Sequence, residues 1–210
     1  MLKILIVDDH AVVRAGLKQI LAETSDMKVA AEAGSGSEAL EMASHGSFDL
    51  VLLDISMPDM SGLDVLKELH RHYETLPILM LSMYPEEQYA IRALKAGAKG
   101  YLTKESAPAE LISAIRKVSQ GGRYISLSLA ENLAFYLGSD ANKSPHQMLS
   151  DREYQVMLMI ASGKTVSEIA DELILSVKTI STNRSRALQK MGMKNNAEFT
   201  YYAVKEGLVR

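Results

Sequence analysis

Up to about residue 121 the chain alternates five short apolar runs with five stretches of helical periodicity. The apolar runs lie at residues 4–7, 28–33, 50–54, 77–82 and 100–102. The helical stretches, which space apolar residues by three or four, lie at 11–23, 37–45, 62–71, 86–96 and 107–120. Strands that are apolar throughout are typical of a parallel sheet covered by helices on both faces. We therefore predict a doubly wound α/β domain with a five-stranded parallel sheet over residues 1–121.

The alternation stops after residue 121. Residues 122–147 contain an apolar helical patch at 129–137 and then a polar stretch that Gly138 and Pro145 interrupt. Glycine and proline in a polar segment are typical of a connection between domains. We predict a linker over 122–147 that includes a short helix.

Helix-capping signals recur in the last third of the chain. Three residues that can cap a helix stand three positions before a Glu: Ser150, Thr165 and Asn195. A fourth candidate cap, Ser176, lies between Thr165 and Asn195. Glycines stand where the helices should end, at Gly163, Gly192 and Gly207. We predict an all-α domain over residues 148–210 with four helices, at about 151–162, 166–174, 177–191 and 196–206.

Composition excludes several classes of protein. The chain has no cysteine, which excludes disulfides, zinc–thiolate sites and thiol nucleophiles. It has no run of 18 apolar residues and no signal-like start, so we expect a cytoplasmic protein without a membrane partner. Charge is uneven, because residues 146–210 carry nine Lys and Arg against seven Asp and Glu, whereas residues 1–145 carry fourteen against nineteen. This asymmetry favours two domains with different partners.

Polar residues follow four of the five predicted strands. Asp8 and Asp9 follow the first strand and Asp54 ends the third, while Ser82 ends the fourth and Lys104 comes after the fifth. The carboxyl ends of parallel strands meet at one edge of a sheet, which is where ligands collect in this fold class. We therefore expect three carboxylates, a hydroxyl and an ammonium to converge.

Clustered carboxylates raise one another's pKa unless a cation offsets their charge. Oxygen ligands with open water positions favour Mg²⁺, and magnesium gathers phosphate oxygens. Asp54 would then be a carboxylate nucleophile for a phosphoryl group, which Lys104 would pair with and Ser82 would hydrogen-bond. A single Asp at a strand end is usually a turn or cap residue, and His10 is expected to start a helix rather than to bind metal. The combination of all five residues predicts the site.

With these residues the chain resembles the NarL/FixJ family of two-component response regulators over essentially its whole length. The receiver resemblance lies in four segments, "IVDDH" at 6–10, "LLDISMPDMSGLDVL" at 52–66, "LS" at 81–82 and "GAKGYLTK" at 97–104. It implies phosphorylation by a sensor histidine kinase, with Asp54 as the phosphoacceptor.

The resemblance also implies roles for the neighbouring residues. Mg²⁺ would be bound by Asp9, by Asp54 and by the backbone carbonyl of Ser56, with Asp8 acting directly or through water. Lys104 and Ser82 would hold the phosphoryl group, and Tyr101 would be the aromatic side chain that reports the switch.

Residues 165–192 have the form of a helix-turn-helix. The predicted second helix places Ile180, Leu188 and Met191 on one apolar stripe. Basic and hydroxyl side chains occupy the remaining faces, which suits a helix that enters the major groove of DNA. The expected DNA contacts are Lys178, Thr179, Ser181, Thr182, Ser185, Arg186 and Lys190.

A solvated helix in a small bundle would have a similar composition. The order of caps and helices nevertheless resembles the LuxR-type DNA-binding domain, in "LSDREYQVMLMIASG", "EIADEL", "SVKTIS" and "NNAEFTYYAVKEGLV". This resemblance implies binding to double-stranded DNA, and the family leads us to expect a homodimer on activation.

The sequence thus predicts a transcription regulator that phosphorylation of Asp54 switches in a Mg²⁺-dependent reaction, and not an enzyme beyond its own phosphotransfer. One alternative is a phosphohydrolase with an aspartyl-phosphate intermediate. Such enzymes commonly have a second acid two residues after the nucleophile, where this chain has Ser56. The other alternative is a DNA-binding protein whose first domain serves only for protein interaction.

Overall fold

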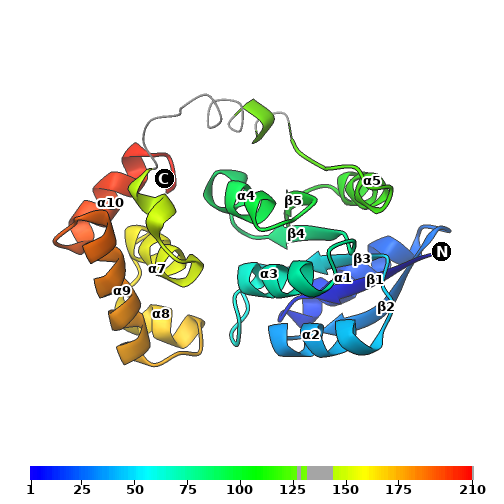
Figure 1. The fold of residues 1–210 in the computed structure, drawn as a ribbon, viewed down its shortest axis with the longest axis horizontal. Coiled ribbons are helices and arrows are strands. Elements are labelled where there is room, and N and C mark those ends of the chain that lie inside the picture. Colours follow the sequence, from blue (N-terminus) through cyan, green and yellow to red (C-terminus); the bar gives the residue numbers. More distant parts are fainter. Residues whose placement is uncertain (127–128, 132–143, 210) are drawn as a thin grey trace. The chain divides into compact units, whose positions relative to one another are not determined.

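The computed structural model describes residues 1–126, 129–131 and 144–209, and the chain forms two compact units, residues 1–134 and 135–210 (Figure 1). In the predicted linker, residues 129–131 are helical, and the remainder of the predicted helical patch, residues 132–137, lies outside the described residues.

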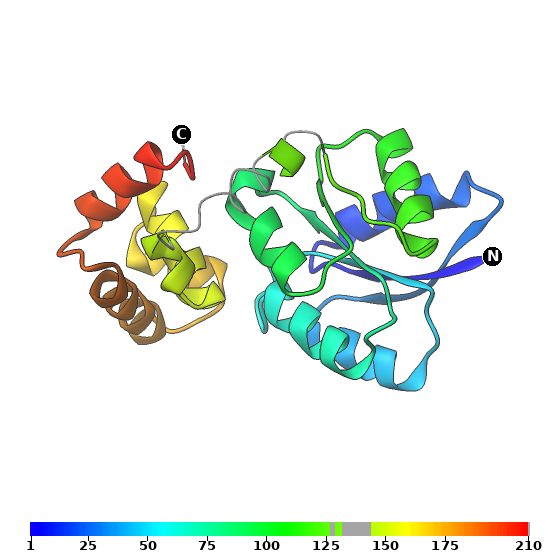
Figure 2. The ribbon, with the colours of Figure 1, turned by 45° about the horizontal axis from the view of Figure 1, so that its top comes forward.

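The first unit is built on a five-stranded parallel sheet in the order β2-β1-β3-β4-β5. The strands are β1 (Leu2–Val7), β2 (Met27–Ala33), β3 (Leu50–Leu53), β4 (Ile78–Ser82) and β5 (Gly100–Thr103). The helices are α1 (Ala11–Ala22), α2 (Gly36–His45), α3 (Gly62–His72), α4 (Glu86–Lys95) and α5 (Pro108–Ser119). Helices α1 and α5 cover one face of the sheet, and α2, α3 and α4 cover the other (Figures 1 and 2). The predicted doubly wound fold is confirmed.

The central strands form the core of this unit. Residues 4–7 of β1 and every residue of β3 and β4 are buried, as their continuous apolar sequences predict. Strand β2 lies at an edge of the sheet and is buried only at its two ends, Met27 and Ala33, whereas Lys28 is exposed. Strand β5 lies at the other edge, and its residues 100–102 are buried.

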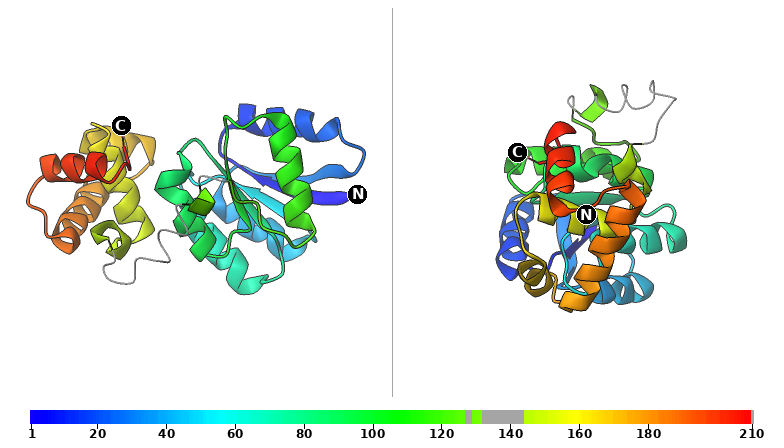
Figure 3. Two further views of the ribbon diagram at one scale, coloured as in Figure 1. Left: turned by 90° about the horizontal axis from the view of Figure 1, so that it is seen from above. Right: turned by 90° about the vertical axis from the view of Figure 1, so that its left-hand side faces the viewer.

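The second unit contains α7 (Asp151–Ala161), α8 (Val166–Glu172), α9 (Val177–Met191) and α10 (Asn196–Lys205), preceded by a short 3₁₀ helix, η1 (Pro145–Met148). Figure 3 shows these helices from two further sides. The four predicted helices are confirmed, and η1 begins within the range 122–147 that is predicted as a linker. In η1, the ring of His146 lies 2.7 Å from the hydroxyl of Tyr202 on α10, a contact between distant parts of the sequence.

The caps hold the ends of these helices. Ser150 and Thr165 form full capping boxes with the Glu three residues on, as predicted. Asn195 also caps α10 through the N–H of Glu198, but the Glu198 carboxylate accepts from the N–H of Lys194 instead of closing a box. The predicted apolar stripe of α9 is buried through Ile180, Ala187, Leu188 and Met191.

No helix in the described parts of the chain has the length and apolar character that a bilayer crossing needs.

Gly62 allows the first turn of α3 to lie against the end of β3. Its N–H donates to the carbonyl of Ile55 at 2.8 Å. A Cβ at this position would lie 1.8 Å from the backbone carbonyl oxygen of Asp54, far closer than atoms can approach. The backbone around Asp54 is therefore built on a contact that only glycine permits.

Replacing Gly62 by Ala should lower the free energy of unfolding by about 3 kcal/mol, because the clash is with backbone and no side chain can move to relieve it. Gly16→Ala is the matched control, since Gly16 lies in α1 with open space around it. That change should raise stability by about 0.5–1 kcal/mol. Chemical denaturation of both variants tests this, and equal effects would contradict the role of Gly62.

Candidate functional site

Carboxylates from two strand ends meet at the carboxyl edge of the sheet. Asp8 and Asp9 follow β1, and Asp54 follows β3, which is hydrogen-bonded to β1. Oxygen atoms of these three residues and a ring nitrogen of His10 lie within 4.8 Å of one another. Asp8 and Asp54 are each 2% exposed, so their charges are held inside the protein.

Lys104 joins two of the carboxylates from the end of β5. Its Nζ lies 2.6 Å from Asp8 Oδ2 and 2.9 Å from Asp54 Oδ2. Its backbone N–H donates to the carbonyl of Ser82 at 2.8 Å, which fixes the residue at the end of the sheet. The ammonium thus bridges β1 and β3 from a third strand.

Burial determines the electrostatics of Asp54. Loss of hydration raises the pKa of its carboxyl from 3.8 to about 6; Lys104 opposes this rise and Asp8 adds to it. Burial lowers the pKa of Lys104, but the charges of Asp54 and Asp8 outweigh burial and the net pKa is raised. The lysine therefore remains charged while Asp54 stays ready to accept a proton or a cation.

The charges of the site leave room for a cation. Three carboxylates face one buried ammonium, so the cluster carries an excess negative charge that a hard divalent ion with oxygen ligands would balance. The side chain of Asp9 is 28% exposed, so an ion bound to it would remain accessible to water. Ser56, the other residue predicted at the metal, lies half-buried in the loop after β3.

Ser82 and Tyr101 are both fully buried and both contact the backbone of Tyr84. The hydroxyl of Ser82 accepts a hydrogen bond from the N–H of Tyr84 at 3.1 Å. The hydroxyl of Tyr101 donates to the carbonyl of Tyr84 at 2.7 Å, and burial raises the pKa of this phenol. One residue of the β4–α4 loop therefore connects the two side chains predicted to form the switch.

The structure adds the side chain of His10 to the cluster. His10 begins α1, as expected, but its Nδ1 also lies 2.8 Å from Asp9 Oδ1 and 3.4 Å from Asp8 Oδ1. Sequence reasoning assigned this residue only to the helix start. Its position next to two acids was the available signal.

Asp59 is a second contribution that sequence reasoning missed. It lies in the loop between β3 and α3, and its carboxylate accepts from the N–H groups of Gly36 and Ser37 and from the Ser37 hydroxyl, at 2.8–3.0 Å. These bonds tie the loop that follows Asp54 to the start of α2. Nothing in the sequence pairs two residues 22 positions apart.

In the second unit, α9 presents one exposed face of basic and hydroxyl side chains. Lys178, Thr182, Ser185 and Arg186 are exposed and recur at helical spacing. Several hydroxyls of the predicted contacts also bond within the helix. Thr182 donates to the carbonyl of Lys178 at 2.8 Å, and the hydroxyl of Thr179 lies 2.8 Å from that of the cap Ser176. Ser181 is half-buried.

Lys190 lies at the other end of α9, and its exposed side chain pairs with an acid of α7. Its Nζ donates to Glu153 Oε2 at 2.6 Å, and Glu153 is the buried acid of the α7 capping box. This ion pair joins α9 to the start of α7. The DNA contact expected of Lys190 stays a prediction.

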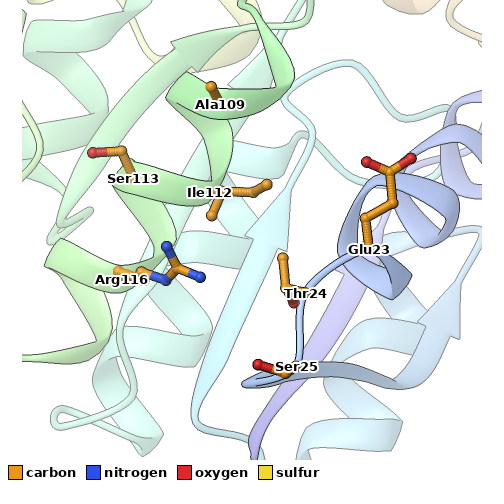
Figure 4. Close-up of a pocket in the computed structure, with 7 residues that line it drawn as sticks. All are labelled: Glu23, Thr24, Ser25, Ala109, Ile112, Ser113 and Arg116. Atoms are coloured by element: carbon orange, nitrogen blue, oxygen red, sulfur yellow. The ribbon is translucent and has the colours of Figure 1, made fainter.

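One hollow on the first unit lies away from the carboxylates. It is lined by Glu23, Thr24 and Ser25 after α1 and by Ala109, Ile112, Ser113 and Arg116 on α5 (Figure 4). Arg116 already forms two hydrogen bonds with Asp26, at 2.9 and 3.0 Å. The hollow brings together no group that the chemistry of the acidic cluster would use.

Comparisons with known proteins agree with this geometry. Residues 4–116 match the family described as the response regulator receiver domain, and residues 147–203 match the bacterial regulatory proteins of the luxR family. The chain is a NarL-family response regulator. It is a two-component transcriptional regulator with a LuxR-type DNA-binding domain, and this family is not one of catalytic enzymes. The phosphohydrolase alternative is therefore set aside.

Relatives of this regulator match along their whole length. It is 39% identical over 209 residues to the response regulator UvrY of Escherichia coli strain K12, covering 99% of this chain and 96% of UvrY. It is 38% identical over 210 residues to the response regulator GacA of Pseudomonas syringae pv. syringae, covering 100% and 98%.

A solved structure is also similar. RcsB from Salmonella enterica serovar Typhimurium, bound to promoter rprA in the presence of the phosphomimetic BeF₃⁻, is 26% identical with a TM-score of 0.66, over 97% of this chain and 99% of that one. Another solved structure contains two RcsB dimers bound to two parallel DNAs, at 25% identity and a TM-score of 0.60, over 97% and 98%.

Replacing Asp54 by Asn should stabilise the protein at neutral pH. The raised pKa means that the folded wild type binds a proton more tightly than the unfolded chain, so its stability falls as pH rises from about 4 through about 6. Asp54→Asn avoids this loss, so its advantage should grow to at most about 3 kcal/mol near pH 7 and vanish near pH 4. Calorimetry of the full chain across this range measures it.

Asp26→Asn is the matched control for this change. The hydrogen bond from Arg116 is the main cause that lowers the pKa of Asp26, so its removal should reduce stability at neutral pH. A gain for Asp54→Asn that did not depend on pH would contradict the buried-charge explanation.

Two basic residues of α9 should behave differently when replaced by Gln. Lys190→Gln should lower the stability of the second unit by about 1 kcal/mol, because it leaves Glu153 without its cation. Arg186→Gln should leave stability unchanged but reduce by about one the slope of log affinity for DNA against log salt, since an exposed Arg binds phosphate. Thermal melts separate the two variants, because only Lys190→Gln should lower the melting temperature, and salt titrations measure the slope for Arg186→Gln. A loss of stability in Arg186→Gln but not in Lys190→Gln would contradict these assignments.

Proposed function

We propose that phosphorylation of Asp54 by a sensor histidine kinase switches this regulator between states of low and high DNA affinity. The observation that carries the proposal is the position of the Asp54 carboxylate, buried beside Asp8 and 2.9 Å from the ammonium of Lys104. The receiver domain implies a histidine kinase as partner. The transfer takes a phosphoryl group from a phosphohistidine of that kinase.

In this reaction an oxygen of the Asp54 carboxylate attacks phosphorus. The P–N bond of the phosphohistidine breaks, and the leaving imidazole nitrogen keeps the electron pair. Lys104 offsets the negative charge of the phosphoryl oxygens, and Ser82 donates a hydrogen bond to one of them. The product is an acyl phosphate on Asp54.

Mg²⁺ is the cofactor that the site fits. Asp8, Asp9 and Asp54 and the backbone carbonyl of Ser56 would hold it, and it would neutralise charge on the transferred group when bound. The excess of carboxylates over cations in the cluster supports this proposal.

The switch runs through the backbone of Tyr84. A phosphoryl oxygen that accepts a hydrogen bond from the hydroxyl of Ser82 would turn this side chain and so disturb the bond that it accepts from the N–H of Tyr84. Tyr101 holds the carbonyl of Tyr84, so it would respond to that change. The surface around the β4–α4 loop would then exist in two arrangements, which phosphorylation biases.

The DNA contacts are proposed on the exposed face of α9. Lys178, Arg186 and Lys190 would bind phosphates, whereas Thr179, Ser181, Thr182 and Ser185 would face base edges or their flanks. RcsB binds DNA as dimers, and we infer that this regulator also forms a homodimer on activation. We propose the domain boundaries 1–121, 122–147 and 148–210 and a place in the cytoplasm, where the chromosome lies.

The full chain and Asp54→Asn should be incubated with sheared genomic DNA, with and without acetyl phosphate plus Mg²⁺, and the retained DNA sequenced. Intact mass should show one added phosphoryl group on the wild type only. Enrichment of a symmetric motif should require both the donor and Asp54. Equal enrichment without donor would favour the alternative in which the first domain serves only for protein interaction, and no enrichment in any arm would overturn the proposed DNA contacts.

A further inference from the structure

The turn between α8 and α9 contains an apolar side chain that is exposed, although the apolar side chains on either side of it are not. Ile174 is 73% exposed, although Leu173 before it is buried and Leu175 after it is half-buried. Val177, the first residue of α9, is 51% exposed. Both residues are β-branched and apolar, and they flank the cap Ser176. Neither contributes to the core of the unit.

Ile174 also has an unfavourable backbone conformation. Its φ is +50°, and it is the only residue other than glycine with positive φ among those that the structure describes. At the ends of the three other α-helices of this unit the chain has glycine with positive φ, at Gly163, Gly192 and Gly207. A β-branched residue in this region costs about 1–2 kcal/mol. Glycine or asparagine would fit the turn better and would also remove exposed apolar surface.

The charge around this pair identifies what covers it. Residues 173–197 contain no Asp or Glu, and Lys178 is exposed beside Val177. The acids before this range are Asp171 and Glu172, and Glu172 pairs with Lys164. A polyanion is therefore attracted to this end of α9. In helix-turn-helix proteins the N-terminal residues of the second helix approach base edges in the major groove. The 5-methyl group of thymine is the apolar group that the major groove offers.

We propose that Ile174 and Val177 form an apolar contact with thymine methyl groups where α9 enters the groove. This inference rests on the proposed DNA binding and adds two specificity-determining residues to it. The contact explains why a strained, exposed isoleucine occupies a turn that glycine would fill at lower cost.

The test compares thymine with deoxyuridine, which lacks only the methyl group. DNA is first selected from a random-sequence library by the full wild-type chain treated with acetyl phosphate and Mg²⁺. The selected duplex is then made with deoxyuridine in place of thymine. Affinity of the wild type should fall about fourfold for each contacted methyl group. The double variant Ile174→Asn, Val177→Ser, which has no methyl group at either position, should bind both duplexes equally, at the weaker affinity.

Thermal stability separates this role from a structural one. The double variant should melt about 4 °C higher than the wild type, because the strain at residue 174 is relieved. Ile174→Leu should keep its sensitivity to the methyl groups. Met148→Gln is the matched control, since Met148 in η1 is also 51% exposed but lies outside α9. It should leave the sensitivity to deoxyuridine unchanged.

Several results would overturn the inference. These are a wild type that ignores deoxyuridine, a double variant that keeps the wild-type sensitivity, or selected DNA without recurrent thymines. A double variant that binds DNA more tightly only without the phosphodonor would show that another part of this chain covers the pair. If the wild type selects no DNA at all, the proposed function fails, and this inference fails with it.

Discussion

The first unit depends on one buried ammonium placed between two buried carboxylates. Lys104 reaches Asp8 and Asp54 only because β1, β3 and β5 end at the same edge of the sheet. Removing three charges from water is costly, and their mutual attraction repays this only when the geometry is good. The backbone around the site supplies that geometry, through the contact at Gly62 and the bond from the N–H of Lys104 to Ser82. The sheet therefore sets the positions of the three charges, and their mutual attraction depends on those positions.

The two units handle charge in opposite ways. The first holds negative charge in a buried cluster, where the pKa of Asp54 rises and a cation or phosphoryl group meets a strong local field. The second exposes positive charge on α9, where water and salt weaken it but a polyanion can reach it. Burial suits a reaction at one carboxylate, and exposure suits a long, uniformly charged ligand.

The sequence was sufficient to predict what depends on local pattern. Continuous apolar runs predicted the strands, capping residues predicted the helices, and the rule that parallel strands end together predicted that Asp8, Asp54 and Lys104 would meet. The sequence was insufficient where a contact joins side chains from distant segments. The bonds of Asp59 to the start of α2 and the ion pair of Lys190 with Glu153 depend on tertiary packing that no periodicity encodes. The positive φ of Ile174 could not be predicted for another reason, since isoleucine is not expected in that conformation.

The stripe that anchors α9 and the face that it exposes share no residues. Ile180, Ala187, Leu188 and Met191 fix the helix in the unit, and the hydroxyl of Thr182 bonds to the backbone of the helix itself. Substitutions of Lys178, Ser185 and Arg186 on the exposed face therefore leave the packing intact. Gene duplicates of such a regulator can acquire new promoters one residue at a time without passing through unstable intermediates.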